Sequence, residues 1–212
     1  MTLALIVILP LLGSLLPLLF KNQGRSLCAT MAMVAPVIGL ALLWRHADAV
    51  FAGQTLIQSR PWLSELGLNI SFRLDGLSFL FALMIQGIGL LVILYARYYL
   101  SKNDPMGRFF CYLQLFMSAM LGVVLSENLL LLMVFWEMTS LSSFLLIGYW
   151  SHSTDARKGA RMALAVTGAG GLALLAGILL LGQIVGSYEL TDVFAAGEQI
   201  RQHALYPVIL VL

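Results

Sequence analysis

The sequence predicts an all-helical, polytopic membrane protein with six full transmembrane helices and the start of a seventh. Hydrophobic residues make up 60% of the 212 residues, whereas charged residues make up only 10%. A soluble domain carries about 25% charged residues. The mean hydropathy is +0.94, and the apolar residues gather in runs of the length that crosses a bilayer.

Each predicted span is an apolar run bounded by polar or charged residues. The first run has no basic leader and no small-residue cleavage site, so we interpret it as a retained helix and not a signal peptide. The final run, from Ala204 to Leu212, is too short to cross a membrane, so we expect the chain to stop within a seventh helix. The six full spans are Thr2–Phe20, Leu27–Trp44, Leu77–Tyr99, Phe109–Leu125, Asn128–Tyr149 and Met162–Val185.

The distribution of Lys and Arg predicts the orientation. Eight of the 12 basic residues fall in alternate loops, which the positive-inside rule places in the cytoplasm, with the N-terminus outside. The eight are Lys21, Arg25, Arg97, Lys102, Arg108, Arg157, Lys158 and Arg161.

Two segments on the opposite side are longer than a turn. Residues 45–76 are predicted to form an outer loop, and the alternation over Leu68–Phe72 is compatible with a short hairpin. Residues 188–201 are acidic and amphipathic, and we expect this segment to lie at the interface with Val193, Phe194 and Ile200 facing the membrane.

Several site classes have no support in the sequence. Cys28 and Cys111 fall at apolar helix positions, and no His or Cys spacing typical of a metal or haem site occurs. Phosphate-binding glycine motifs are absent, and the cations are too dispersed for nucleic-acid binding. The sequence therefore predicts no cofactor, no metal and no nucleic-acid partner.

Asp75 precedes a helix and is interpreted as its N-terminal cap.

Glu137 is the candidate functional residue. The eight residues between it and Asn128 are all apolar, which places its carboxyl near the middle of the bilayer. An acid at that depth is costly and usually serves ion or proton movement. The alternative is a protonated acid that hydrogen-bonds to a neighbouring helix.

Other polar residues inside the spans are weaker candidates. Ser140 shares the Glu137 face, so its hydroxyl is placed to donate to the carboxylate or to hold a water. Gln86, Gln114 and Ser118 either extend a hydrated path or bond between helices, and the second reading is preferred. The glycines at Gly168, Gly170 and Gly171 are expected to permit close helix packing.

Three stretches resemble the proton-translocating antiporter-like subunits of Mrp-type cation/proton antiporters and of respiratory complex I. They are residues 71–101 (SFRLDGLSFLFALMIQGIGLLVILYARYYLS), residues 120–150 (MLGVVLSENLLLLMVFWEMTSLSSFLLIGYW) and residues 156–177 (ARKGARMALAVTGAGGLALLAG). The last is similar to the large, A-type subunit of Mrp antiporters in particular. Gly168 and Gly171 stand where the complex I pattern is expected to have an arginine and an aspartate, which argues for the Mrp type.

The resemblance implies the N-terminal part of an inverted-repeat antiporter fold in the plasma membrane. It implies a transporter subunit, not an enzyme, that exchanges protons for monovalent cations within a hetero-oligomer, with Na⁺ as the expected cation. It also implies that Glu137 pairs with a lysine on a later helix, beyond Leu212, which would stabilise its charged form.

Two alternatives remain open. One is a proton-pumping membrane subunit of a complex I-type NADH:quinone oxidoreductase. The other, from a different class, is a non-transporting scaffold or a truncated relic.

Overall fold

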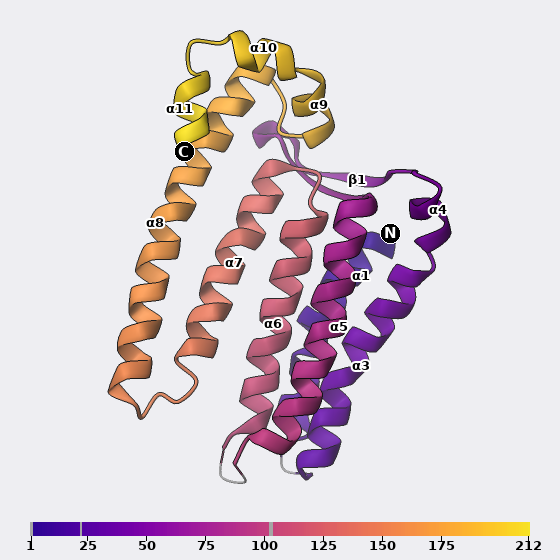
Figure 1. Cartoon of the computed structure of the whole chain (residues 1–212), viewed down its shortest axis with the longest axis vertical. Helices are drawn as coiled ribbons and strands as arrows, with labels where there is room; N and C mark the ends of the chain where they lie inside the picture. Colours follow the sequence, from indigo (N-terminus) through magenta and orange to yellow (C-terminus); the bar gives the residue numbers. More distant parts are fainter. Residues whose placement is uncertain (1, 22, 102–103) are drawn as a thin grey trace.

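Six long apolar helices run side by side along the length of the molecule (Figure 1). The structure is a computed structural model that describes residues 2–21, 23–101 and 104–212. Within these ranges six spans are long and apolar enough to cross a membrane, which confirms the predicted fold class. The first span comprises α1 (Thr2–Gly13) and α2 (Leu15–Leu19), and the others are α3 (Arg25–Trp44), α5 (Gly76–Tyr99), α6 (Met106–Leu125), α7 (Leu129–Ile147) and α8 (Thr154–Val185).

Two helix boundaries differ from the prediction. The first span is interrupted at Ser14, because Pro17 has no N–H to donate to the carbonyl of Gly13 one turn earlier. The last span begins at Thr154 and not at Met162, because the hydroxyl of Ser153 accepts from the backbone N–H of Ala156 and starts the helix there. Capping, and not hydropathy, therefore sets this boundary.

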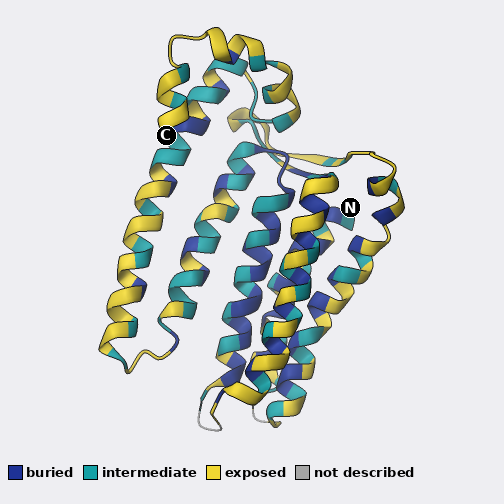
Figure 2. Ribbon diagram, in the orientation of Figure 1, coloured by how far each residue is buried: buried dark blue, intermediate teal, exposed yellow. Residues whose placement is uncertain are grey.

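Helices α1, α3, α5 and α6 pack into one group, and α7 and α8 follow in order along one side of it (Figure 1). Glycines allow the close approaches. An ideal Cβ at Gly122 of α6 would lie 2.1 Å from the ring of Phe135 on α7, and one at Gly13 of α1 would lie 2.5 Å from the Cβ of Ala35 on α3. Helix α6 is the most buried span and α8 the most exposed (Figure 2).

The segment between α3 and α5 holds a β-hairpin. After α4 (Ala47–Phe51), strand β1 (Leu56–Leu63) pairs antiparallel with β2 (Leu68–Leu74), and Ser59 lies opposite Ser71. A 3-10 turn (Ser64–Leu66) and Gly67, whose φ of 69° suits glycine, connect the strands. The hairpin that the alternating residues favoured is thus present.

Three short helices follow α8 and fold back beside its end (Figure 1). They are α9 (Leu190–Ala195), α10 (Gly197–Gln202) and α11 (Tyr206–Val211). Phe194 is 66% exposed and Val193 is half-buried, but Ile200 is only 8% exposed. The expectation that Ile200 faces the membrane is therefore wrong, because α10 packs against α8 and turns this side chain inward.

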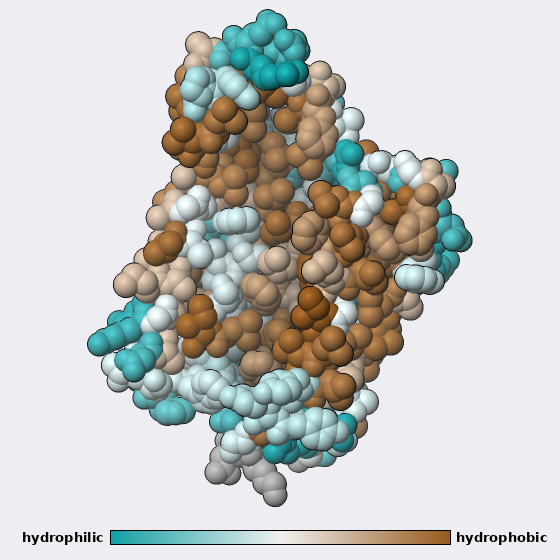
Figure 3. Space-filling model, viewed as in Figure 1, coloured by the Kyte–Doolittle hydropathy of each residue, from teal (hydrophilic) through white to brown (hydrophobic). Residues whose placement is uncertain are grey.

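The connections alternate between two ends of the molecule. The α2–α3, α5–α6 and α7–α8 connections, with their basic residues, lie together at what we call the basic end; Lys102 lies outside the described residues (Figure 1). The hairpin, the α6–α7 connection and α9–α11 lie at the opposite, hairpin end. Figure 3 shows a mainly apolar body between hydrophilic patches at the two ends, as the membrane assignment requires.

The predicted cap at Asp75 is present as a reciprocal capping box. The carboxylate accepts from the N–H of Ser78 at 2.9 Å, and the Ser78 hydroxyl accepts from the N–H of Asp75 at 2.8 Å. Burial alone would raise the pKa of Asp75, but the bonds from Ser78 and the guanidinium of Arg73 outweigh it and lower the pKa below its usual 3.8.

We expect Asp75→Ala to lower the free energy of unfolding by about 1 kcal/mol. Because the folded-state pKa is lowered, the charged cap stabilises fully above pH 3.8 and is lost as the pH falls through the folded pKa. Thermal unfolding of the complete protein at neutral pH and at pH 3 measures this. The melting temperature should fall less between the two pH values in Asp75→Ala than in the native protein. Asp75→Asn, which can still accept at the cap, should cost less; equal losses would contradict the capping explanation.

Candidate functional site

Helix α7 carries Glu137 about midway along its length. The helix starts at Asn128, whose side-chain oxygen accepts from the N–H groups of Leu130 and Leu131, each at 3.1 Å. This double cap fixes the first turn at the hairpin end. The apolar residues that follow place the Glu137 carboxyl away from both ends of the span.

The Glu137 carboxylate lies against α8 at Gly171. An ideal Cβ built at Gly171 would lie only 2.0 Å from Oε1 of Glu137 and 3.2 Å from its carboxyl carbon. Glycine is therefore the residue that leaves room for the carboxylate at this contact. The prediction that glycines permit close packing here is confirmed for Gly171, whereas ideal Cβ atoms at Gly168 and Gly170 meet no described atom within 4 Å.

Glu137 is half-buried. Among the residues that the structure describes, its carboxylate has neither a hydrogen-bond donor nor a cationic partner. An unpaired carboxyl at membrane depth is costly unless it exchanges a proton or pairs with a cation from elsewhere. The arrangement therefore suits proton handling or pairing with a further positively charged group.

The hydroxyls near Glu137 bond within their own helix. Ser140 donates to the carbonyl of Trp136 at 3.4 Å, and not to the Glu137 carboxylate as the sequence suggested. Ser142 and Ser143 likewise donate to carbonyls three or four residues back. In a span where water is scarce, the backbone carbonyl is the nearest acceptor for such a side chain.

Two of the predicted path residues hold helices together. Nε2 of Gln114 donates to the carbonyl of Ala32 at 2.8 Å. That carbonyl would ordinarily accept from residue 36, but Pro36 has no N–H, so Gln114 on α6 replaces the missing donor of α3. Ser118 donates to the carbonyl of Val7 on α1 at 2.7 Å.

Gln86 on α5 is also fully buried, and neither of its side-chain polar atoms has a partner among the described residues. Its amide faces Gly39 of α3, where an ideal Cβ would lie 2.2 Å from Nε2. Gln86, Gln114 and Ser118 thus contact α1 and α3, whereas Glu137 contacts α8. The structure does not join them into one site, and their role in a hydrated path stays a prediction.

A buried polar junction at the hairpin end was missed by the sequence reasoning. Glu127, in the α6–α7 connection, is 2% exposed. Its Oε1 accepts from the N–H of Thr191 at 2.9 Å and from the Thr191 hydroxyl, and its Oε2 lies 3.5 Å from the Arg73 guanidinium. Arg73 also pairs with Asp75 at 3.1 Å.

Glu189 extends this junction to the hairpin. Its Oε1 accepts from Asn69, Ser71 and Asn128 at 2.9, 3.3 and 3.0 Å. The backbone N–H of Glu127 donates to the carbonyl of Ser71 at 2.9 Å, and the N–H of Leu190 donates to the carbonyl of Glu127 at 2.8 Å. The junction therefore ties β2, the α6–α7 connection and the start of α9 together. A charged residue flanked by Ser126 and Asn128 between two apolar spans was the available signal.

Within the described part of the chain, no group of three or more His, Cys, Asp or Glu is placed to hold a metal ion. Cys28 and Cys111 are buried free thiols, and the Cys28 sulfur lies 3.4 Å from the carbonyl of Pro17.

Two family models match the chain. Residues 62–110 match the model described as the N-terminus of chain 5 of NADH-ubiquinone oxidoreductase, or complex I. Residues 126–212 match the model described as the transmembrane region of NADH:quinone oxidoreductase and the Mrp antiporter.

Similar curated proteins carry antiporter names. The chain is 48% identical over 210 residues to the A/B subunit of a probable K⁺/H⁺ antiporter of Rhizobium meliloti, covering 99% of this chain and 21% of that protein. It is 41% identical over 207 residues to the A1 subunit of a Na⁺/H⁺ antiporter of Staphylococcus haemolyticus, covering 97% of this chain and 26% of that protein. The chain thus spans about a quarter of the length of these relatives.

Solved structures share the fold. A chain of the Mrp complex from Dietzia sp. superposes with a TM-score of 0.85 at 28% identity, over 100% of this chain and 23% of that one. A chain of the membrane-bound sulfane sulfur reductase, an archaeal respiratory membrane complex, superposes with a TM-score of 0.79 at 21% identity, over 100% of this chain and 32% of that one. The similarity to the sulfane sulfur reductase chain supports the fold alone.

Proposed function

Because the chain belongs to the family of antiporter-like membrane subunits that includes the A-type subunits of Mrp antiporters, we propose that it is part of a proton-translocating subunit of a multisubunit monovalent cation/proton antiporter. The observation that carries the proposal is the Glu137 carboxylate, unpaired among the described residues and held at mid-span against Gly171. A cation that approaches it would stabilise its charge, and withdrawal of that cation would favour its protonation. Glu137 then acts as a switch in coupling.

The proposed setting is a multi-pass protein in the plasma membrane, in a complex with other antiporter subunits. The basic end faces the cytoplasm and the N-terminus lies outside, because cytoplasmic connections carry the excess of Lys and Arg. Na⁺ is the first cation to test. The name of the 48% identical relative makes K⁺ the second.

Glu137→Gln in the complete complex tests the coupling role. Inverted vesicles from a host without its own antiporters would be acidified inside, and a pH-sensitive dye would report the effect of added Na⁺ or K⁺. We expect the native protein to raise the lumenal pH and Glu137→Gln to slow this response at least about tenfold, since a positioned proton-transfer group contributes on the order of 100-fold or more.

Glu198→Gln is the matched control, because Glu198 is 71% exposed at the hairpin end and should leave exchange unchanged. Unaltered exchange in Glu137→Gln would refute the role of Glu137.

The match of residues 62–110 to a complex I model supports a second candidate, a proton-pumping subunit of a NADH:quinone oxidoreductase. Proton movement on addition of NADH, without any response to Na⁺ or K⁺, would favour that candidate.

A further inference from the structure

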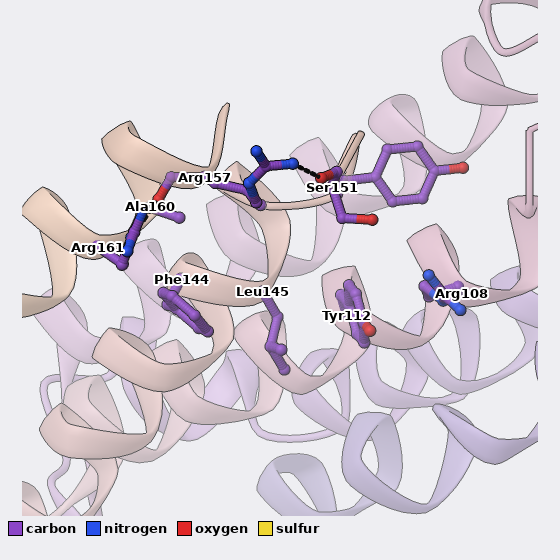
Figure 4. Close-up of a pocket in the computed structure, with 10 residues that line it drawn as sticks. Arg108, Tyr112, Phe144, Leu145, Ser151, Arg157, Ala160 and Arg161 are labelled. Atoms are coloured by element: carbon purple, nitrogen blue, oxygen red, sulfur yellow. Dashed lines mark hydrogen bonds between the residues drawn. The ribbon is translucent and has the colours of Figure 1, made fainter. Parts of the chain in front are cut away.

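A cavity of about 470 Å³ opens at the basic end, between α6, α7 and α8 (Figure 4). Helix α6 contributes Arg108 and Tyr112, helix α7 contributes Phe144 and Leu145, and helix α8 contributes Arg157 and Arg161, with residues of the α7–α8 connection between them. This region is separate from the contact between Glu137 and Gly171. No feature of the proposed coupling mechanism uses it.

Three arginines line the cavity: Arg108, Arg157 and Arg161. Among the described residues, none of the three has a carboxylate partner. The neighbouring acids Asp104 and Asp155 do not line the cavity. Three uncompensated cations around one opening create a strong local attraction for an anion.

The arginines of α8 are ordered by the protein itself. Arg157 donates to the carbonyl of Ser151 at 2.8 Å (Figure 4). It also donates to the hydroxyl of Thr154 at 3.4 Å. Arg161, one turn later on the same face, donates through Nε to the carbonyl of Arg157 at 3.3 Å, which is its one hydrogen bond to a described residue. Within the described ranges its two terminal nitrogens therefore keep N–H groups for a ligand, in the planar geometry that matches phosphate oxygens.

Part of the lining is apolar and aromatic. Tyr112, Phe144 and Leu145 lie between Arg161 at one side of the cavity and Arg108 at the other (Figure 4). Tyr149, which also lines the cavity, is 6% exposed and its hydroxyl has no partner in the described structure. Burial, and then the charge of Asp104, raises the pKa of Tyr149 to about 12, so the hydroxyl stays protonated and able to donate. A ligand that fits this wall has an anionic head and an apolar body.

We propose that this cavity binds the phosphate headgroup of an anionic phospholipid. The three arginines hold the phosphate at the level of the membrane interface, where basic pockets between transmembrane helices recognise such headgroups. The acyl chains follow the apolar wall and the exposed Leu141, one turn before Leu145 on α7. A free phosphate ion would match the arginines but would leave the apolar wall without a partner.

The test measures lipid retained by the complete protein. The protein would be reconstituted in vesicles of phosphatidylcholine, with or without phosphatidylglycerol, then extracted and weighed intact by native mass spectrometry. We expect retained phosphatidylglycerol and little phosphatidylcholine. The triple variant Arg108→Gln, Arg157→Gln, Arg161→Gln should weaken retention on the order of 100-fold, because each arginine near the surface contributes about fivefold.

Matched variants separate lipid binding from misfolding. Arg201→Gln, at the hairpin end, should retain the lipid fully. The triple Lys variant of the same three arginines keeps the charge and should lose much less than the triple Gln variant. Equal retention by the native protein and the triple Gln variant, or equal loss in Arg201→Gln, would overturn the proposal. Added inorganic phosphate should not displace the lipid; phosphate that binds while phosphatidylglycerol does not would overturn the lipid assignment.

Discussion

Replacing Gly171 by alanine should slow cation–proton exchange at least about tenfold without lowering thermal stability. The new methyl carbon would lie 2.0 Å from Oε1 of Glu137, so the carboxylate has to move. The glutamate side chain is flexible at that end, which makes the displacement cheap for the fold. A misplacement of about 1 Å can cost on the order of 100-fold in rate when geometry decides the reaction. Alanine is also about 1 kcal/mol more favourable than glycine inside a helix.

Gly170→Ala is the matched control on the same helix. An ideal Cβ there meets nothing within 4 Å among the described residues, so exchange should stay at the native level while helix propensity rises equally. Dye-monitored exchange in vesicles and thermal unfolding of the purified complex give the two readouts. If Gly171→Ala and Gly170→Ala exchange at the same rate, the position of the carboxylate against α8 does not govern coupling.

The spans were predictable because membrane helices leave a local signal in the sequence. About 20 apolar residues in a row satisfy their own backbone groups only as a helix, and all six runs are helices in the structure. The break at Ser14 was missed although its cause, Pro17, was visible, because the averaged hydropathy of the run does not register a single missing N–H. The start of the last span at Thr154 was missed because the prediction placed the boundary by apolar content, whereas the cap at Ser153 sets it.

The candidate site was predictable only in part. Glu137 was found because a charge in an apolar run is a local anomaly. Its contact with Gly171 depends on how α7 packs on α8, which no local pattern specifies. The burial of Glu127 left no local signal, since its partners Arg73 and Thr191 are both more than fifty positions away.

The polar junction at the hairpin end should be the most sensitive point of the fold to loss of one charge. Arg73→Gln leaves the Glu127 carboxylate, 2% exposed, without the guanidinium that lies 3.5 Å from Oε2. Removing one partner of a buried ion pair costs about 3–5 kcal/mol. We expect about 3 kcal/mol here, because the Arg73 side chain is itself 22% exposed and partly hydrated. Thr191 continues to hold the other oxygen.

Hydrogen exchange of the complete protein, followed over residues 68–74, 126–128 and 188–191, measures the local free energy of opening. These three segments meet at the junction, so they should lose protection together in Arg73→Gln. Adding Glu127→Gln removes the buried charge and should restore protection to within about 1 kcal/mol of the native protein, the sign of a coupled pair. Arg201→Gln breaks an exposed pair and should change protection by less than about 0.5 kcal/mol. The guanidinium carbon of Arg73 also lies 5.6 Å from the ring centroid of Phe194. If the losses of protection in the two single variants simply add in the double variant, Arg73 stabilises the hairpin by packing on Phe194 and not through Glu127.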